Sequence, residues 1–141
     1  LVDYKFHCFD GEPRIVMVCS ERFSSGGLKI DYFTPEWEHL PFKAYYENAS
    51  TPPDRPELLE SMLDIARRLS AGLAAVRVDL YEIEGRVMFG ELTFSSGSGM
   101  WQYTPHEWDV RMGQMVRLPQ GPELRGRHRA IAGDAGPSPI A

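Results

Sequence analysis

The chain has 141 residues, of which 43% are hydrophobic and 11% aromatic, a composition typical of one globular domain. Its formal net charge of −5, without a basic stripe in the part expected to fold, excludes a general nucleic-acid surface, which needs clustered Lys and Arg. No apolar run approaches the roughly 20 residues that cross a bilayer, so we expect a soluble, cytoplasmic protein without a membrane span.

The first predicted element is a β-hairpin. Residues 2–9 alternate between apolar and polar side chains, and Asp10-Gly11 separates them from the run 14–19, which is apolar after Arg14. An Asp-Gly pair between two such runs is a typical hairpin turn. Because the chain opens at Leu1 without an initiator Met and already in strand-like alternation, we expect a fragment of a longer protein.

A long loop and a helix follow. Residues 21–46 show no sustained periodicity, and a loop of that length is often functional. A Pro-rich linker at 51–56 leads into a predicted helix with Asp54 as N-cap and Glu57 at the capping-box position, closed by Gly72. An apolar stripe on this helix is expected to pack on a sheet; its members are Leu58, Leu59, Met62, Ile65, Ala66 and Leu69.

A second hairpin is predicted from strands at 75–82 and 86–94, joined by a three-residue loop at 83–85 with Gly85 in the left-handed conformation. Successive strand residues point to opposite faces of a sheet. One face should therefore meet a core through Val76, Val78 and Leu80. The other face should carry Arg77, Asp79 and Tyr81.

This register places Arg77 opposite Glu91 and puts Asp79 and Glu91 on one face. Carboxylates on opposed or diagonal positions lie about 5–8 Å apart, and such a pair can hold Mg²⁺, which takes one or two protein carboxylates together with phosphate oxygens and water. A two-residue loop would instead shift the register by one and turn Glu91 to the face of Val78. Taken alone, such charges most often form a solvated cross-strand cluster.

The remaining segments complete the expected architecture. A Ser/Gly-rich stretch at 95–99 precedes a helix predicted from about Pro105 to Leu118. The order of elements predicts an α+β fold, with an antiparallel sheet of about four strands and packed helices. Residues 119–141 shift to Pro, Gly, Ala and Arg, and we expect a disordered tail there, which leaves 1–118 as the folded domain.

Several residue types with chemical potential are assigned ordinary roles. The cysteines form no CxxC pair and are expected to be buried reduced thiols: Cys8 and Cys19. Three isolated histidines share no ligand spacing and are expected at the surface or in loops: His7, His39 and His106. The tryptophans either pack beneath loops, which is commoner, or line a sugar-binding face: Trp37, Trp101 and Trp108.

Five motifs occur in order along the chain: Asp3-Tyr4-Lys5-Phe6 with Phe9-Asp10-Gly11-Glu12-Pro13; Glu21-Arg22-Phe23; Leu40-Pro41-Phe42; Arg77-Val78-Asp79-Leu80-Tyr81; and Gly90-Glu91-Leu92-Thr93-Phe94 with Gly97-Ser98-Gly99. Together they resemble the TupA-like ATP-grasp family, named for teichuronopeptide biosynthesis. The resemblance covers roughly residues 2–118 and only the carboxyl-terminal part of such a protein. It implies the carboxyl-terminal subdomain of the ATP-grasp fold, with the adenine pocket lying before Leu1.

The resemblance implies an ATP-dependent carboxylate–amine ligase that acts through an acyl phosphate. ATP and Mg²⁺ would be the cofactors. The partners would be small-molecule carboxylate and amine substrates, sugar-linked if the family's association with cell-surface polysaccharide assembly applies. The isolated fragment would be inactive, since half of the ATP clamp would be missing.

The resemblance also implies roles for individual residues. Mg²⁺ would be held by Asp79 and Glu91, with Thr93 standing where many ATP-grasp proteins have Asn. Arg77 would stabilise the acyl phosphate and the later oxyanion. Further implied contacts to phosphate or substrate come from the cations Lys5 and Arg22 and from the backbone of Gly97, Ser98 and Gly99.

A second hypothesis is a non-catalytic carbohydrate-binding or scaffolding module derived from an ATP-grasp fold. Two features favour it. Thr93 replaces Asn, and the loop after Arg22 is poor in basic residues. Tight sugar binding without any effect of MgATP would support this alternative.

Overall fold

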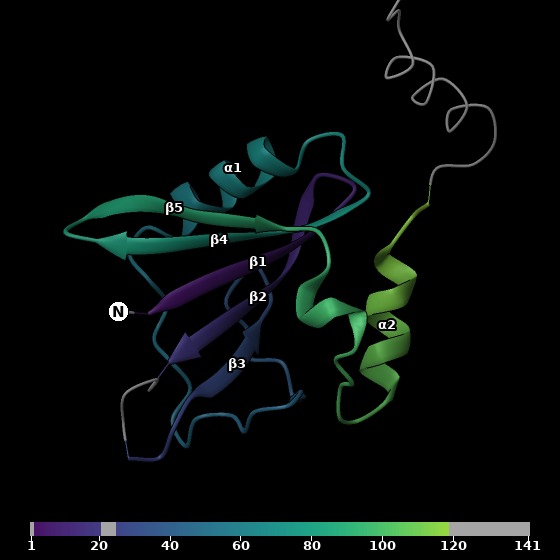
Figure 1. Ribbon diagram of the computed structural model, residues 1–141. Helices are drawn as coiled ribbons and strands as arrows, with labels where there is room; N and C mark the ends of the chain where they lie inside the picture. The colour runs from purple at the N-terminus through teal and green to yellow at the C-terminus, as the bar shows by residue number, and fades with distance from the viewer. Residues whose placement is uncertain (1, 21–24, 119–141) are drawn as a thin grey trace, which may run out of the picture.

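The structure is a computed structural model that describes residues 2–20 and 25–118. Its strands are β1 (Asp3–Phe9), β2 (Glu12–Ser20), β3 (Lys29–Phe33), β4 (Ala75–Ile83) and β5 (Arg86–Thr93), and its helices are α1 (Leu59–Ser70), α2 (Glu107–Met115) and the short 3₁₀ turn η1 (Ser96–Gly99). The strands form one antiparallel sheet in the order β3-β2-β1-β4-β5 (Figure 1). The predicted α+β class is confirmed. The tail predicted at 119–141 lies outside the described residues.

The first hairpin forms as predicted. Asp10 and Gly11 have φ values of 52° and 80°, so both adopt the left-handed conformation that a type I′ turn requires. The hairpin places β1 at the centre of the sheet, between β2 and β4, and all residues of β1 are buried. Cys8 and Cys19 are buried thiols and are not joined in a disulfide, as expected.

Strand β3 lies inside the segment that the sequence predicted as an irregular loop. It pairs with β2, and its central residue Asp31 is fully buried. The Asp31 carboxylate contacts His39 Nε2 at 3.0 Å and accepts the Ala49 N–H at 3.2 Å. A buried carboxylate in the middle of this five-residue strand breaks the apolar pattern, so the sequence does not predict β3. The sheet has five strands rather than about four.

Helix α1 begins later than predicted. Its N-cap is Leu58, which makes no side-chain capping bond, so the expected capping by Asp54 is wrong. The Leu59 N–H instead bonds to the Pro56 carbonyl at 3.3 Å, which makes a turn before the helix. The apolar stripe is largely correct, although Leu69 is exposed. The buried members of α1 are Leu59, Met62, Leu63, Ala66 and Ser70.

The sheet has two different faces. One face packs against α1 through an apolar cluster that includes Tyr4, Phe6, Val16, Val78 and Leu80. The other face is apolar over β2 and β3, where Phe42 and Trp108 cover it, and α2 belongs to this second cluster. Figure 1 shows α1 running along the sheet and α2 at its side. Within the described ranges, no helix is long and apolar enough to cross a bilayer.

The second hairpin differs from its predicted register. Its loop has two residues, Glu84 and Gly85, with φ values of 51° and 68°, because Ile83 pairs with Arg86. The predicted three-residue loop is therefore wrong, and so is the predicted pairing of Arg77 with Glu91. Arg77 lies opposite Thr93.

A β-bulge on β5 reverses the effect of the shorter loop. Leu80 pairs with Phe89 and Val78 with Leu92, so β5 has one more residue than β4 between these pairs. This extra residue returns Glu91 to the face of Arg77 and Asp79. Gly90 lies at the bulge, and a Cβ there would come within 2.8 Å of the Tyr81 ring and 3.1 Å of the Asp79 carbonyl oxygen.

Candidate functional site

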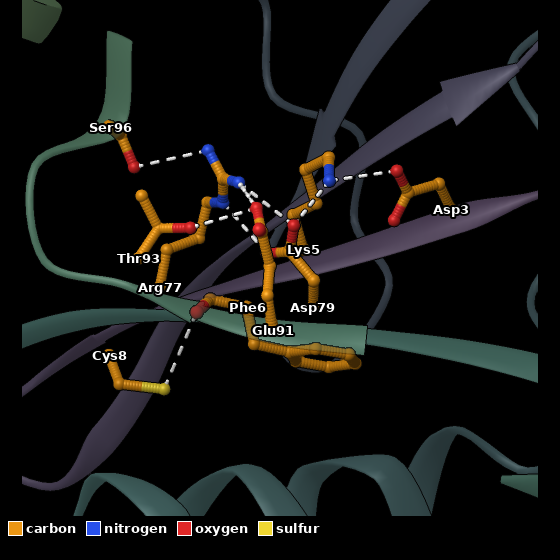
Figure 2. A network of polar contacts seen from close by, with 9 residues as sticks. All are labelled: Asp3, Lys5, Phe6, Cys8, Arg77, Asp79, Glu91, Thr93 and Ser96. Atoms are coloured by element: carbon orange, nitrogen blue, oxygen red, sulfur yellow. Dashed lines mark hydrogen bonds and ion pairs between the residues drawn. The ribbon is translucent and has the colours of Figure 1, made fainter. Parts of the chain in front are cut away.

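A cluster of charged side chains lies on the face of the sheet opposite α1, over β1, β4 and β5. Lys5 on β1 pairs directly with Asp79 on β4. Arg77 precedes Asp79 by two residues and therefore shares its face. Glu91 and Thr93 reach the same place from β5 (Figure 2). The structure thus brings together five residues that were predicted for the site.

Asp79 is the buried centre of this cluster. Its side chain is 1% exposed. The Arg77 guanidinium donates to both of its oxygens, from Nε to Oδ1 at 2.7 Å and from Nη2 to Oδ2 at 2.8 Å. Lys5 Nζ forms an ion pair with the same Oδ2. Bidentate Arg–carboxylate pairs are among the strongest hydrogen-bonded contacts in proteins, so Asp79 is held firmly.

Arg77 connects the buried centre to the accessible edge of the site. Its Nη2 also donates to Glu91 Oε1 at 2.9 Å, and Thr93 Oγ1 donates to the same oxygen at 3.0 Å. Its Nη1 contacts Ser96 Oγ at 3.4 Å. The Glu91 side chain is 62% exposed. A ligand arriving from solvent would therefore meet Glu91 first and Asp79 last.

The electrostatics of the cluster keep its members charged. Burial alone would raise the pKa of Asp79, but hydrogen bonds from Arg77 and Lys5 outweigh it and hold the pKa below its ordinary value. Burial likewise opposes the charge of Lys5, yet its bonds to Asp3 and Asp79 raise the pKa. The pKa of Arg77 is raised for the same reason, since Asp79 outweighs the burial of the guanidinium.

Two residues of the cluster were missed by sequence reasoning. Asp3 lies 2.8 Å from Lys5 Nζ, and Ser96 contacts Arg77. Asp3 precedes Lys5 by two residues in an alternating strand, so the alternation could have predicted that the two side chains share a face. No comparable signal existed for Ser96, because η1 folds back toward Arg77 only through tertiary structure.

The predicted turn at Gly97, Ser98 and Gly99 lies beside the cluster, directly after Ser96. The Ser98 N–H donates to the Ser95 carbonyl at 3.1 Å and is thus used within the turn. A Cβ at Gly97 would lie 2.0 Å from the Trp101 ring, and its φ is 55°. Glycine is therefore required at this position to seat Trp101.

The histidines and tryptophans depart in part from expectation. His7 is buried at 6% exposure on β1, opposite Arg77, so its predicted surface position is wrong. It follows the alternation of Asp3 and Lys5, which places it on the same face. Trp37 stacks on Phe33 and Trp108 stacks on Phe42, each with ring centroids 4.3 Å apart. These two tryptophans pack within the fold, as expected.

A metal ion at this site would rely on few protein ligands. Among the described residues, no group of three or more His, Cys, Asp or Glu side chains could hold one. The available oxygen donors are Asp79, Glu91 and the Thr93 hydroxyl. A carboxylate can accept about four hydrogen bonds, and the contacts of Arg77 and Lys5 to Asp79 use three of these positions. This hard oxygen set fits Mg²⁺, which needs only one or two protein carboxylates.

A family model described as TupA-like ATPgrasp matches residues 1–117, and the chain belongs to this family. The resemblance seen in the ordered motifs is therefore confirmed. Neither a curated protein nor a solved structure matches the chain. The predicted site residue Arg22 lies outside the described residues.

Proposed function

We propose that residues 1–118 are the catalytic carboxyl-terminal portion of an ATP-dependent carboxylate–amine ligase. The observation that supports this proposal most is the Arg77 guanidinium, which joins buried Asp79 to exposed Glu91. Phosphoryl transfer depends mainly on positioning and on neutralising charge. A fixed guanidinium beside two carboxylates that suit Mg²⁺ offers both.

The proposed reaction has two steps. In the first, a carboxylate oxygen of the acid attacks the γ-phosphorus of ATP, and the bond to the bridging oxygen breaks with its electron pair leaving on ADP. In the second, the amine nitrogen attacks the carbonyl carbon of the acyl phosphate. Inorganic phosphate then leaves, the nitrogen loses a proton, and an amide results.

The roles of the residues follow from their positions. Arg77 would neutralise the transferring phosphoryl group and the later oxyanion, because its Nη1 makes only a long contact to Ser96. Lys5 would hold Asp79 in place. Asp79, Glu91 and Thr93 would bind Mg²⁺, which supplies Lewis-acid stabilisation of the phosphate oxygens when bound. Roles for Arg22 and for Gly97, Ser98 and Gly99 toward ATP remain part of the proposal.

The biological setting is proposed from the family. We place the reaction in the cytoplasm, where ATP is available, and in the assembly of cell-surface polysaccharide or teichuronopeptide. The acid and the amine would be small molecules, one of them sugar-linked.

The experiment measures Mg²⁺-dependent release of ADP by the complete protein encoded by the reading frame that contains this chain. Asp79→Asn and Glu91→Gln should each lower the rate at least 100-fold, while Glu84→Gln, at the exposed turn of the same hairpin, should leave it within twofold. Circular dichroism confirms that each variant is folded. Turnover of both site variants at the wild-type rate would contradict the proposal.

The alternative function is a non-catalytic carbohydrate-binding or scaffolding module. One observation favours it: the Asp79 carboxylate is already neutralised by Arg77 and Lys5, so the cluster holds together without a metal ion. Tight sugar binding by the complete protein, with no MgATP-dependent release of ADP, would select this alternative.

A further inference from the structure

A cavity of about 370 Å³ adjoins the charged cluster. It lies between β1, β4, the η1 turn and α2. Most of its lining is aromatic or aliphatic and includes Phe9, Phe94, Trp101, Tyr103, Met112 and Val116. Small-molecule sites typically have volumes of about 300–1,000 Å³, with an apolar lining and a few polar groups that orient the ligand.

Polar residues also line this cavity. They include Arg77, Thr93, Ser96 and His7, and among the described residues that line the cavity none is an Asp or Glu. Arg77 directs Nε and Nη2 toward Asp79 and Glu91, whereas Nη1 points to the cavity residue Ser96, as Figure 2 shows. One guanidinium therefore contacts both the carboxylate pair and the cavity.

His7 adds a ring nitrogen without a hydrogen-bond partner among the described residues. It is buried, it lines the cavity, and its Nε2 has no hydrogen-bond partner among the described residues. Buried polar atoms are almost always paired, so such an atom beside a cavity indicates a place for a ligand or a water. Burial and the adjacent Arg77 charge lower the pKa of His7 to about 4, which keeps the ring neutral.

We propose that this cavity binds the acid substrate of the ligase, and that this acid has an apolar or aromatic body. Its carboxylate would face Arg77 Nη1 and Ser96, and its body would lie against Trp101 and Val116. That the bound acid is a substrate rests on the proposed ligase function. An acid fits this cavity better than an amine, since an ammonium group would find a guanidinium and no carboxylate among the described lining residues.

The test uses 3-phenylpropanoate as the probe, with 3-phenylpropylamine and propanoate as matched ligands that lack the acid or the apolar body. Binding to this chain is followed by the indole N–H signal of Trp101 in heteronuclear NMR, assigned with Trp101→Phe. The dissociation constant of 3-phenylpropanoate should be at least fivefold lower than that of either matched ligand.

Gly113 offers a variant that fills the rim of the cavity. It lines the cavity and lies within α2, and a Cβ there would meet no atom within 4 Å apart from its chain neighbours and the backbone of its own helix. Gly113→Leu also favours the helix, because Leu has a much higher helix propensity than Gly. We expect this variant to weaken 3-phenylpropanoate binding at least fivefold. Gln114→Leu, which lines a different cavity, should change it less than twofold.

Three results would overturn the inference: no binding of the acid, equal binding of the amine, or acid binding that Gly113→Leu and Arg77→Lys both leave unchanged. Failure of the proposed function has a different signature. Acid binding with the expected variant pattern, but no release of ADP by the complete protein, would retain the site and reject the ligase. ADP release without acid binding in the cavity would retain the ligase and reject the site.

Discussion

The two faces of β1 are equally buried but chemically opposite. Tyr4 and Phe6 point to α1 and contribute to an apolar cluster. Lys5 and His7 point to the other side, where they are 9% and 6% exposed. The same strand thus separates an ordinary core from a buried cluster of charges.

The difference shows which part of the molecule stabilises the fold. Burial of an apolar side chain stabilises by about 1.5–3 kcal/mol. Burial of a charge is unfavourable unless its partners compensate, and buried ion pairs are often no better than apolar residues of similar size. The apolar clusters on the two faces therefore hold the fold together, and we propose that the charged cluster serves chemistry rather than stability.

The largest effect should come from the apolar face. Phe6 is fully buried against α1, so Phe6→Ala should lower the free energy of unfolding by about 3–5 kcal/mol. Urea unfolding of this chain measures the loss. Phe94→Ala removes the same ring from a position that is 69% exposed and should cost less than about 1 kcal/mol. Equal losses for the two variants would contradict the comparison.

The next largest effect should come from breaking the charged cluster. Asp79→Asn leaves Lys5 and Arg77 without their shared anion and turns an amide toward two donors, so the loss should be about 3 kcal/mol. Asp64→Asn on α1, where the carboxylate is 75% exposed, is the control and should cost less than about 1 kcal/mol. If Asp79→Asn unfolds at the wild-type urea concentration, Asp79 does not compensate these cations.

A third prediction concerns the pH dependence of stability. The pKa of His7 is lowered from 6.5 to about 4, so the unfolded chain binds a proton that the folded chain does not between these values. Stability should therefore fall as the pH is lowered from 6.5 to 4, by about 1.4 kcal/mol for each pH unit that lies well inside this window. The neighbouring Lys5, Arg77 and Asp79 titrate outside it, since their pKa values are raised or lowered away from this range.

Urea unfolding at several pH values tests this slope. His7→Phe should flatten it between pH 6.5 and 4. A slope that His7→Phe does not alter would show that another group is responsible.

The smallest effect on stability should accompany the change at Glu91. Its side chain is 62% exposed, so Glu91→Gln should alter the free energy of unfolding by less than about 1 kcal/mol. The loss of ADP release expected for this variant would then separate catalysis from folding. A loss of stability as large as that of Asp79→Asn would instead assign Glu91 to the structural part of the cluster.

The sequence predicted the charged face correctly but not the hairpin that forms it. Alternation alone predicts that Arg77 and Asp79 lie on the face of the strand opposite to that of Val78, and the structure agrees. Glu91 shares the face of Arg77 and Asp79 because of a two-residue turn and a bulge at Gly90. Each of these features shifts the predicted register by one residue, and the two shifts cancel. Position 90 at the bulge leaves no room for a Cβ beside the Tyr81 ring and the Asp79 carbonyl oxygen, and no local pattern reveals this crowding.

Other parts of the site depended on tertiary structure. His7 was assigned to the surface because the pattern of β1 predicts which face a residue takes but not what covers that face. Strand β3 could not be predicted because buried Asp31 interrupts its apolar pattern. The partners of Asp31, His39 and Ala49, come from a later segment of the chain. The family match identifies the class of protein, whereas the cavity beside Arg77 emerges only when α2 and η1 are in place.

The most direct test of this comparison replaces the buried charges by apolar residues. A variant with Asp3→Val, Lys5→Met, Arg77→Met and Asp79→Leu is compared with the wild-type chain by urea unfolding. If the charged face serves chemistry, the variant should be as stable as the wild type to within about 1 kcal/mol, or more stable. A loss of more than about 3 kcal/mol would contradict the account and show that the cluster is needed to hold the fold.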